Sequence, residues 1–224
     1  MRAVILTSIA ICTFLACKKD HSGIIETGPE PRPTKVTSDT LTSGSWRDFT
    51  IGQTTDQVYL KIQNFPSETY APYLGIIKNI YTEVTQLENK IPLYNQLLLD
   101  ETIGTGTGIQ VTFQNDKVSS IYTNNGTSLS RWPSGVNINA AIVINDDVSA
   151  IYQKLTNINA GPFNNKLQRM SLFSKNVMKS YDPAMAAAPS WEFSTITGGK
   201  HYVIVLNFSA GILTSMYVNL IEPL

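Results

Sequence analysis

The chain has 224 residues, of which 42% are hydrophobic and 15% carry a charge. This composition is ordinary for a globular core, and the length allows one large domain or two small ones. Lysine and arginine together number 17, as do aspartate and glutamate, so the formal net charge is zero. A neutral chain without clusters of basic residues is not expected to bind nucleic acid.

Residues 1–16 have the pattern of a secretion signal. Arg2 supplies a positive charge, and residues 3–14 form an apolar run too short to span a membrane. The segment TFLACKKD resembles a bacterial lipoprotein signal, which implies that Cys17 is lipidated and becomes the mature N-terminus. An ordinary secretory signal, or a membrane anchor with an incidental cysteine, is the alternative. We therefore expect a lipoprotein of the cell envelope, anchored at the outer membrane through Cys17.

Residues 17–44 differ in composition from the rest of the chain. They are rich in Lys, Asp, Gly, Pro, Ser and Thr, and prolines alternate at positions 29, 31 and 33. Such a segment has almost nothing to bury, so it is expected to be a flexible tether. The globular part is expected to begin at residue 45.

The globular part contains an internal duplication. Residues 108–124 have the pattern of a β-hairpin, and residues 202–219 repeat it, with equivalent positions 95 apart. Residues 51–65 have the pattern of a short amphipathic helix with Thr54 as its N-cap, and they are repeated 93 positions later by residues 144–158, where Asp147 is the N-cap. Two stretches that recur at nearly equal offsets indicate two copies of one structural unit.

The first hairpin is expected to have one apolar and one polar face. A two-residue turn at positions 115–116 would place Phe113 opposite Val118 and Val111 opposite Ser120. Side chains alternate between the faces of a strand, so these positions share the face that packs on the core. The other face is mostly polar, with Ile121 as an exception, and is expected to point outward. Its polar residues are Gln110, Thr112, Ser119 and Thr123.

The second hairpin, with its turn at positions 210–211, is apolar on both faces. An apolar face of this kind is covered either by the protein itself or by a partner, and the sequence leaves both possibilities open. We take the outer face, together with the strand that precedes the hairpin, as the candidate ligand-binding surface. Its residues are Trp191, His201, Val203, Val205, Met216 and Val218.

Each unit is expected to contain a second helix. Apolar residues spaced by three and four predict it within residues 70–91. A weaker pattern of the same kind covers residues 167–181. Branched side chains in these segments leave a strand as the alternative for part of each. Strands are then predicted over residues 94–100 and 191–197, ahead of the hairpins.

The predicted fold class is therefore α+β, with two tandem repeats, each of two helices packed on one face of an antiparallel sheet. The repeats cover residues 45–126 and 140–224, and residues 127–139 connect them. The segments IGQTTDQVYLKI and VTFQNDKVSSIY, with their second copies, resemble the repeat of β-lactamase-inhibitor-protein-like domains and of the small SmpA/OmlA outer-membrane lipoproteins. The resemblance implies a noncatalytic module that binds protein through the open face of its sheets.

The sequence offers few groups for catalysis or metal binding. Of its two histidines, His21 lies in the expected tether and His201 beside a turn, so a two-histidine metal site would need the tether. The glycines at positions 104–108 precede a strand instead of opening a helix, which is the wrong context for binding phosphate. We predict no catalytic residue, no metal and no cofactor.

Two functions follow from these observations. The first is a lipid-anchored envelope protein that binds or scaffolds a protein or a glycan through its open sheet face. The alternative is an envelope hydrolase that uses carboxylates or His201. A broad, shallow surface would favour binding, and a deep pocket that converges on His201 or on paired carboxylates would favour an enzyme.

Overall fold

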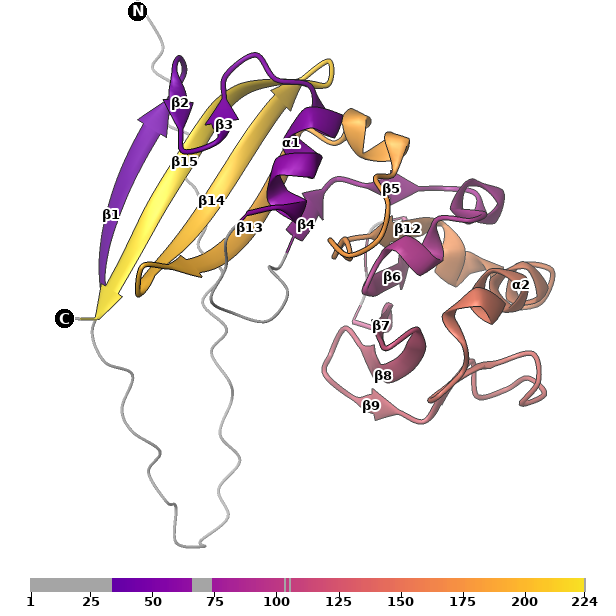
Figure 1. The fold of residues 1–224 in the computed structure, drawn as a ribbon. Coiled ribbons are helices and arrows are strands. Elements are labelled where there is room, and N and C mark those ends of the chain that lie inside the picture. Colours follow the sequence, from indigo (N-terminus) through magenta and orange to yellow (C-terminus); the bar gives the residue numbers. More distant parts are fainter. Residues whose placement is uncertain (1–33, 66–73, 103, 105, 224) are drawn as a thin grey trace, which may run out of the picture. The chain divides into compact units, whose positions relative to one another are not determined.

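The computed structural model describes residues 34–65, 74–102, 104 and 106–223. The predicted signal, His21 and the lipidation site Cys17 lie outside these residues. Pro33–Leu224 form one compact unit. It is mostly β-structure, with two α-helices among the described residues (Figure 1).

The strands form two main antiparallel sheets. Sheet I has the order β1 (Thr34–Leu41), β15 (Ile212–Pro223), β14 (Lys200–Ser209), β13 (Ser190–Thr197) and β4 (Leu74–Ile77). Sheet II has the order β5 (Ile80–Tyr81), β12 (Arg169–Leu172), β6 (Gln96–Asp100), β7 (Ile109–Gln114), β8 (Lys117–Thr123) and β9 (Ser128–Leu129). Two short hairpins complete the strands: β2 (Ser45–Trp46) with β3 (Phe49–Thr50), and β10 (Arg131–Trp132) with β11 (Ile142–Val143).

Strand β1 lies within the predicted tether. Its eight residues pair antiparallel with β15 from Thr34 opposite Pro223 to Leu41 opposite Met216. The prediction of a flexible tether is therefore wrong for residues 34–41, because their backbone groups are used in a sheet that composition alone does not reveal.

Each α-helix begins where the sequence predicts and packs on one sheet. Helix α1 (Thr55–Gln63) has Thr54 as its N-cap, and α2 (Val148–Asn159) has Asp147. The Thr55 amide donates to the carbonyl of Gly211 at the turn of sheet I, at 3.0 Å. The Val148 amide donates to the carbonyl of Asp116 at the turn of sheet II, at 2.9 Å. Each helix is thus fixed to a hairpin turn by its first residue.

The contacts between helix and hairpin recur along the chain at the two offsets found in the sequence. The Gly52 amide donates to the carbonyl of Leu213 at 2.8 Å, and the Asn145 amide donates to that of Val118 at 2.9 Å. The first residues of these pairs are 93 positions apart and the second are 95 apart. The same backbone arrangement is therefore built twice.

The two copies exchange parts. Strand β4, which follows α1, pairs with β13 of the later copy, and β12, which follows α2, pairs with β6 of the earlier one. The exchanged strands meet where Gly75 bridges Ser174 and the Ile76 amide donates to the Phe173 carbonyl at 2.8 Å. Each sheet therefore contains strands from both predicted repeats.

The predicted repeat of two helices on a sheet is wrong, because the described residues of each copy form one α-helix. The described part of 70–91 forms β4, β5 and two 3-10 turns at Val84–Leu87 and Ile91–Leu93. Residues 167–181 contribute to the 3-10 turn Asn164–Leu167, to β12 and to the segment before a further turn at Pro183–Ala187. Lys78 and Asn89 have positive φ angles of 61° and 59°, which a continuous helix does not allow. The apolar spacing reflects short strands and turns that each bury a few side chains.

Both long hairpins contain a β-bulge that the predicted register lacks. The turn at Asn115 and Asp116 has the expected positive φ angles of 52° and 58°. Phe113 lies opposite Val118 as expected, but the next pair is Thr112 with Ser120, and Val111 then faces Ile121. The equivalent shift occurs in sheet I between Asn207 and Phe208. One extra residue moves every later side chain of the second strand to the other face.

Candidate functional site

The bulge divides the predicted ligand-binding residues between the two faces of sheet I. Met216 lies opposite Leu206 and Val218 opposite Ile204, on the face that packs against the core. Met216 is fully buried and Val218 is 5% exposed. These two residues are therefore part of the core, and their assignment to a ligand surface is corrected.

Trp191 is also a core residue. It is fully buried, its ring centroid lies 4.6 Å from that of Phe208, and it meets Tyr59 of α1 edge to face at 6.5 Å. Its indole N–H donates to the carbonyl of Met185 at 3.3 Å. Trp191 thus joins α1 to sheet I and is not available to a ligand.

The remaining predicted residues lie on the opposite face of sheet I. Val203 is the cross-strand partner of Asn219, Val205 that of Tyr217, and His201 that of Ile221. Val203, Val205 and His201 are half-buried, whereas Tyr217 is 44% exposed. Val36 on the neighbouring β1, opposite Ile221, is 56% exposed. We call this surface the open face of sheet I.

The polar side chains on the open face pair with one another across strands. Ser38 donates to Asn219 at 2.7 Å, Asn207 donates to Ser215 at 3.0 Å, and Ser194 lies 2.7 Å from the His201 Nε2. These bonds satisfy polar groups that a partner would otherwise have to match. Burial of the apolar side chains of Val203, Val205 and Tyr217 by a partner would then provide the favourable free energy of binding.

The Ser194–His201 pair has the separation of a nucleophile and a base. Among the described residues, Ser194 is the hydrogen-bonding partner of the His201 ring, and no carboxylate orients its other nitrogen. The pair lies on the open face of sheet I and does not line the hollow on sheet II described next. The hydrogen bond can fix the orientation of the histidine ring. The pair does not line the hollow, so the hollow does not hold a substrate against it.

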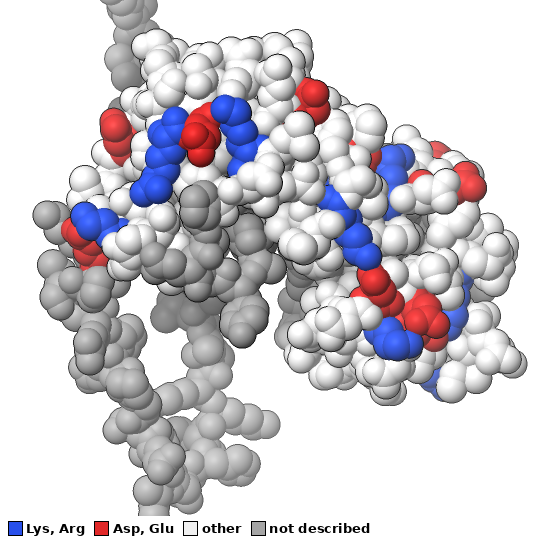
Figure 2. Space-filling view, viewed as in Figure 1, with Lys and Arg blue, Asp and Glu red and all other residues white. Residues whose placement is uncertain are grey.

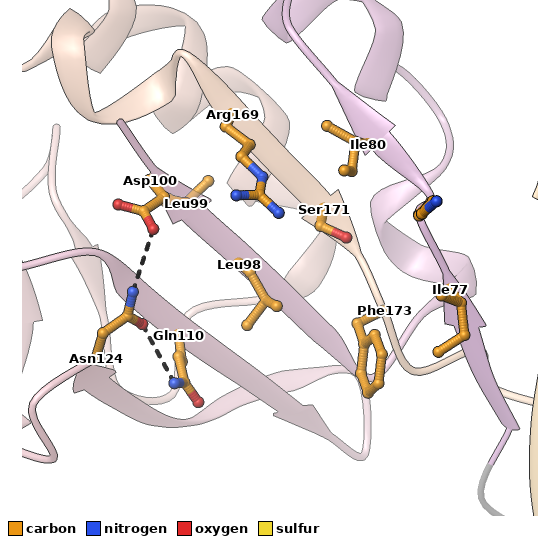
Figure 3. A pocket seen from close by; sticks show the side chains of 11 residues that line it. Ile77, Ile80, Leu98, Leu99, Asp100, Gln110, Asn124, Arg169, Ser171 and Phe173 are labelled. Atoms are coloured by element: carbon orange, nitrogen blue, oxygen red, sulfur yellow. Dashed lines mark hydrogen bonds between the residues drawn. The ribbon is translucent and has the colours of Figure 1, made fainter. Parts of the chain in front are cut away.

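A hollow of about 340 Å³ lies on the outer face of sheet II (Figure 3). Leu98, Ile77 and Ile80 give it apolar walls, and Ile80 is 42% exposed. Its lining residues are Ile77, Lys78, Ile80, Leu98, Leu99, Asp100, Gln110, Asn124, Arg169, Ser171 and Phe173. The size is within the range of small-molecule sites.

Polar side chains gather at one end of the hollow. The Gln110 Nε2 donates to the Asn124 Oδ1 at 3.2 Å, and the Asn124 Nδ2 donates to the Asp100 Oδ2 at 3.3 Å. Figure 3 shows this chain of bonds beside the guanidinium of Arg169, which reaches over Leu98. Sequence reasoning placed Gln110 on an outer face but missed Arg169, because β12 comes from the other copy.

A buried polar cluster lies where the exchanged strands end. Lys175 is 1% exposed, and its ammonium group lies 5.0 Å from the centroid of the Tyr59 ring and 5.7 Å from that of Tyr94. The Tyr94 hydroxyl donates to the Asp182 carboxylate at 2.8 Å and accepts from Asn79 at 3.1 Å. Burial lowers the pKa of Lys175 to about 8, although Asp182 partly opposes the shift. The same burial, with the nearby Asp182 charge, raises the pKa of Tyr94.

This cluster is well suited to a structural role. The Lys175 ammonium donates to the carbonyl of Asn176 at 2.9 Å, and the Asp182 carboxylate accepts from the Ala184 amide at 3.0 Å. Both charged groups therefore have partners within the protein, as buried charges require. A side chain that is 1% exposed does not meet a ligand at the surface.

Charge does not single out a site on the face shown in Figure 2. Acidic and basic side chains lie close together there and are surrounded by uncharged residues. Among the described residues, ion pairs join Lys117 to Asp147 at 2.8 Å and Lys179 to Asp116 at 2.9 Å, and both pairs link the β7–β8 turn to neighbouring elements. The described residues on this face thus form no large patch of one sign.

Neither surveys of the structure for metal sites and membrane spans nor comparisons with known proteins identify a function. Within the described residues, no group of three His, Cys, Asp or Glu side chains is placed to hold a metal ion. None of the helices in that part of the chain is both long and apolar enough to cross a bilayer. Searches of protein-family models, curated proteins and solved structures give no match for this chain.

Proposed function

We propose that the protein is a lipid-anchored binding protein of the bacterial cell envelope, held at the outer membrane through Cys17. The lipoprotein-like segment TFLACKKD supports the anchor. The open face of sheet I is the partner-binding surface, and the protein uses it without catalysis or a cofactor. Of the predicted ligand residues, Val203, Val205 and His201 remain in this surface.

The observation that carries the proposal is the combination of exposed apolar side chains with paired polar ones. Val205 and Tyr217 lie side by side across β14 and β15, and Tyr217 is 44% exposed. Exposed apolar groups of this kind gain free energy when a partner covers them. Aromatic residues such as Tyr217 are enriched at protein interfaces.

The same face favours a protein over a glycan as the partner. A glycan is held by hydrogen-bonding groups that are still available, whereas six polar side chains on this face already bond to one another. Each of these bonds satisfies a donor and an acceptor within the protein, so an apolar protein surface that covers them leaves fewer polar groups unpaired than it would on a face of unbonded side chains. The broad sheet face also matches the shape expected for binding and not that of a deep catalytic pocket.

The test is Val205→Lys in the full chain. Glu192 is the cross-strand neighbour of Val205, so a lysine there faces a carboxylate and remains compatible with the strand. We expect the free energy of unfolding to change by less than about 1 kcal/mol. Proteins crosslinked to the wild-type chain in intact envelopes should be lost.

Asn159→Lys is the matched control, because it adds the same charge at the exposed end of α2, where a cation is favourable. This variant should keep the crosslinked partners. The proposal is wrong if folded Val205→Lys protein captures the same partners as wild type, or if the wild-type chain captures none.

A further inference from the structure

We propose that the hollow on sheet II is a binding site for a small monocarboxylate that carries a hydrocarbon group. The site is separate from the open face of sheet I and does not depend on the function proposed above.

Arg169 faces an acid with which it does not pair. It is the direct cross-strand neighbour of Asp100, on adjacent strands of sheet II. In the part of the chain that the structure describes, no ion pair joins the two side chains. The Asp100 carboxylate instead accepts from the Glu101 amide at 2.8 Å and from Asn124 at 3.3 Å. The guanidinium therefore remains over the hollow (Figure 3).

Gly108 makes this position of Asp100 possible. A Cβ atom at residue 108 would lie 2.8 Å from the Asp100 Cγ and 2.3 Å from the Asn124 Nδ2, closer than atoms can approach. The absence of a side chain at Gly108 thus leaves the space that the Asp100 carboxylate and the Asn124 amide occupy. The separation of Asp100 from Arg169 is built into the backbone of sheet II.

The lining suits a ligand with one negative charge. Arg169 and Lys78 are cationic and Asp100 is anionic, so the three charged side chains have a net charge of +1. The planar guanidinium presents two parallel N–H donors that match the two oxygens of a carboxylate. A dianion such as a phosphate monoester would leave one negative charge in the hollow without a balancing cation, whereas a monoanion neutralises the lining. A monocarboxylate is therefore the better match.

The other end of the hollow suits a hydrocarbon group. Leu98 lies beneath the guanidinium, and Ile77 and Ile80 continue the apolar wall. The hydroxyl of Ser171 donates to the Asn79 carbonyl at 3.0 Å, so towards the hollow it can only accept. Ile80, which is 42% exposed, would be covered by a short alkyl chain. A volume of about 340 Å³ accommodates a ligand of this size.

The experiment titrates hexanoate into the full mature chain carrying Cys17→Ser and follows backbone amide signals by NMR. We expect saturable binding with a Kd of about 1 mM or lower. Arg169→Gln should weaken binding about tenfold or more. Arg169→Lys keeps the positive charge but loses the two parallel N–H donors of the guanidinium, and should weaken binding less. Lys200→Gln removes a charge from the distant hairpin of sheet I and should bind like wild type.

Three probes test the ligand class with the wild-type residues of the hollow, so this result does not depend on whether the Arg169 variants fold. Hexanol and hexyl phosphate should bind at least about tenfold more weakly than hexanoate. Acetyl-leucine resembles the C-terminal residue of a peptide. If it binds as tightly as hexanoate, the result supports a carboxylate ligand and identifies a peptide C-terminus as the source of that carboxylate. Weaker acetyl-leucine binding would support a free carboxylic acid.

The proposal is overturned if hexanoate shows no saturable binding up to about 10 mM, a concentration well above the expected Kd. It is also overturned if folded Arg169→Gln protein binds hexanoate as wild type does, or if hexanol or hexyl phosphate binds as tightly. None of these results affects the partner-binding test at Val205, which lies on the other sheet.

Discussion

Replacing Lys175 by methionine should remove a rise in stability that the wild-type protein shows at alkaline pH. The lysine is fully enclosed, and its burial lowers the pKa from an ordinary value of 10.5 to about 8. Methionine has a similar length and no charge to bury. It would leave the Asn176 carbonyl with its second donor, the Tyr59 hydroxyl at 3.2 Å.

The sign and size of the effect follow from proton linkage. Below pH 8, Lys175 holds its proton in both the folded and the unfolded state, so it adds no pH dependence. Between pH 8 and 10.5 the unfolded chain retains the proton that the folded protein has lost, and the free energy of unfolding therefore increases with pH. At about 1.4 kcal/mol for each pH unit, the increase at pH 9.5 is about 2 kcal/mol.

Buried tyrosines limit the useful pH range. Burial raises the pKa of Tyr59, Tyr81 and Tyr94 above the ordinary value of 10. Above pH 10 the unfolded chain loses these protons before the folded protein does, which decreases the free energy of unfolding. The contribution of Lys175 is therefore best measured below pH 10.

Urea denaturation at pH 7.0, 8.5 and 9.5 measures the effect, with the m-value as a check that unfolding remains two-state. Wild type should gain about 2 kcal/mol across this range, and Lys175→Met should stay level and exceed wild type at pH 7. An unchanged or decreasing wild-type curve, or an equal rise in the variant, would refute the reasoning.

Two further predictions test residues that the sequence placed at functional positions. Trp191→Ala should cost about 3 to 5 kcal/mol in urea denaturation because it empties a core position between α1 and sheet I, whereas the exposed Tyr217→Ala should cost less than about 1; equal costs would contradict the assigned faces. Cys17→Ser should release the protein from the membrane fraction, because lipid chains supply the proposed anchoring; a variant that stays in the membrane after a high-salt wash would show that another segment holds it there.

The local signals in the sequence were sufficient for several elements. The caps Thr54 and Asp147, the turn at positions 115–116 and the strands before both hairpins lie as predicted. Each of these depends on short-range chemistry, such as a side-chain oxygen before a helix or a residue that tolerates positive φ. The offsets of the duplication are equally local, since they compare one stretch of sequence with another.

The bulges left a signal that was visible in the sequence. Ile121 is apolar on the expected polar face, and Met216 and Val218 are surplus apolar residues on the equivalent face of the second hairpin. An extra residue after each turn places all three in the core. A strict alternation of faces cannot include this residue, and for that reason Met216 and Val218 of the predicted ligand surface proved to be buried.

The pairing of β12 with β6 could not be predicted from local pattern. These strands come from different copies, and nothing in their short apolar sequences specifies which neighbour each will take. Arg169 faces the hollow only because of this pairing. The proposed carboxylate site therefore could not be found from the spacing of its residues.

The exchange of helix and strand between the copies has a consequence for a chain that contains only one of them. Residues 140–224 alone would have α2 and β12 without the sheet on which they pack, and β13 without β4 beside it. Two such chains could satisfy each other by trading these arms, as in a domain-swapped dimer. Joining the copies in one polypeptide replaces that bimolecular encounter by an intramolecular one, so assembly no longer depends on the concentration of the protein.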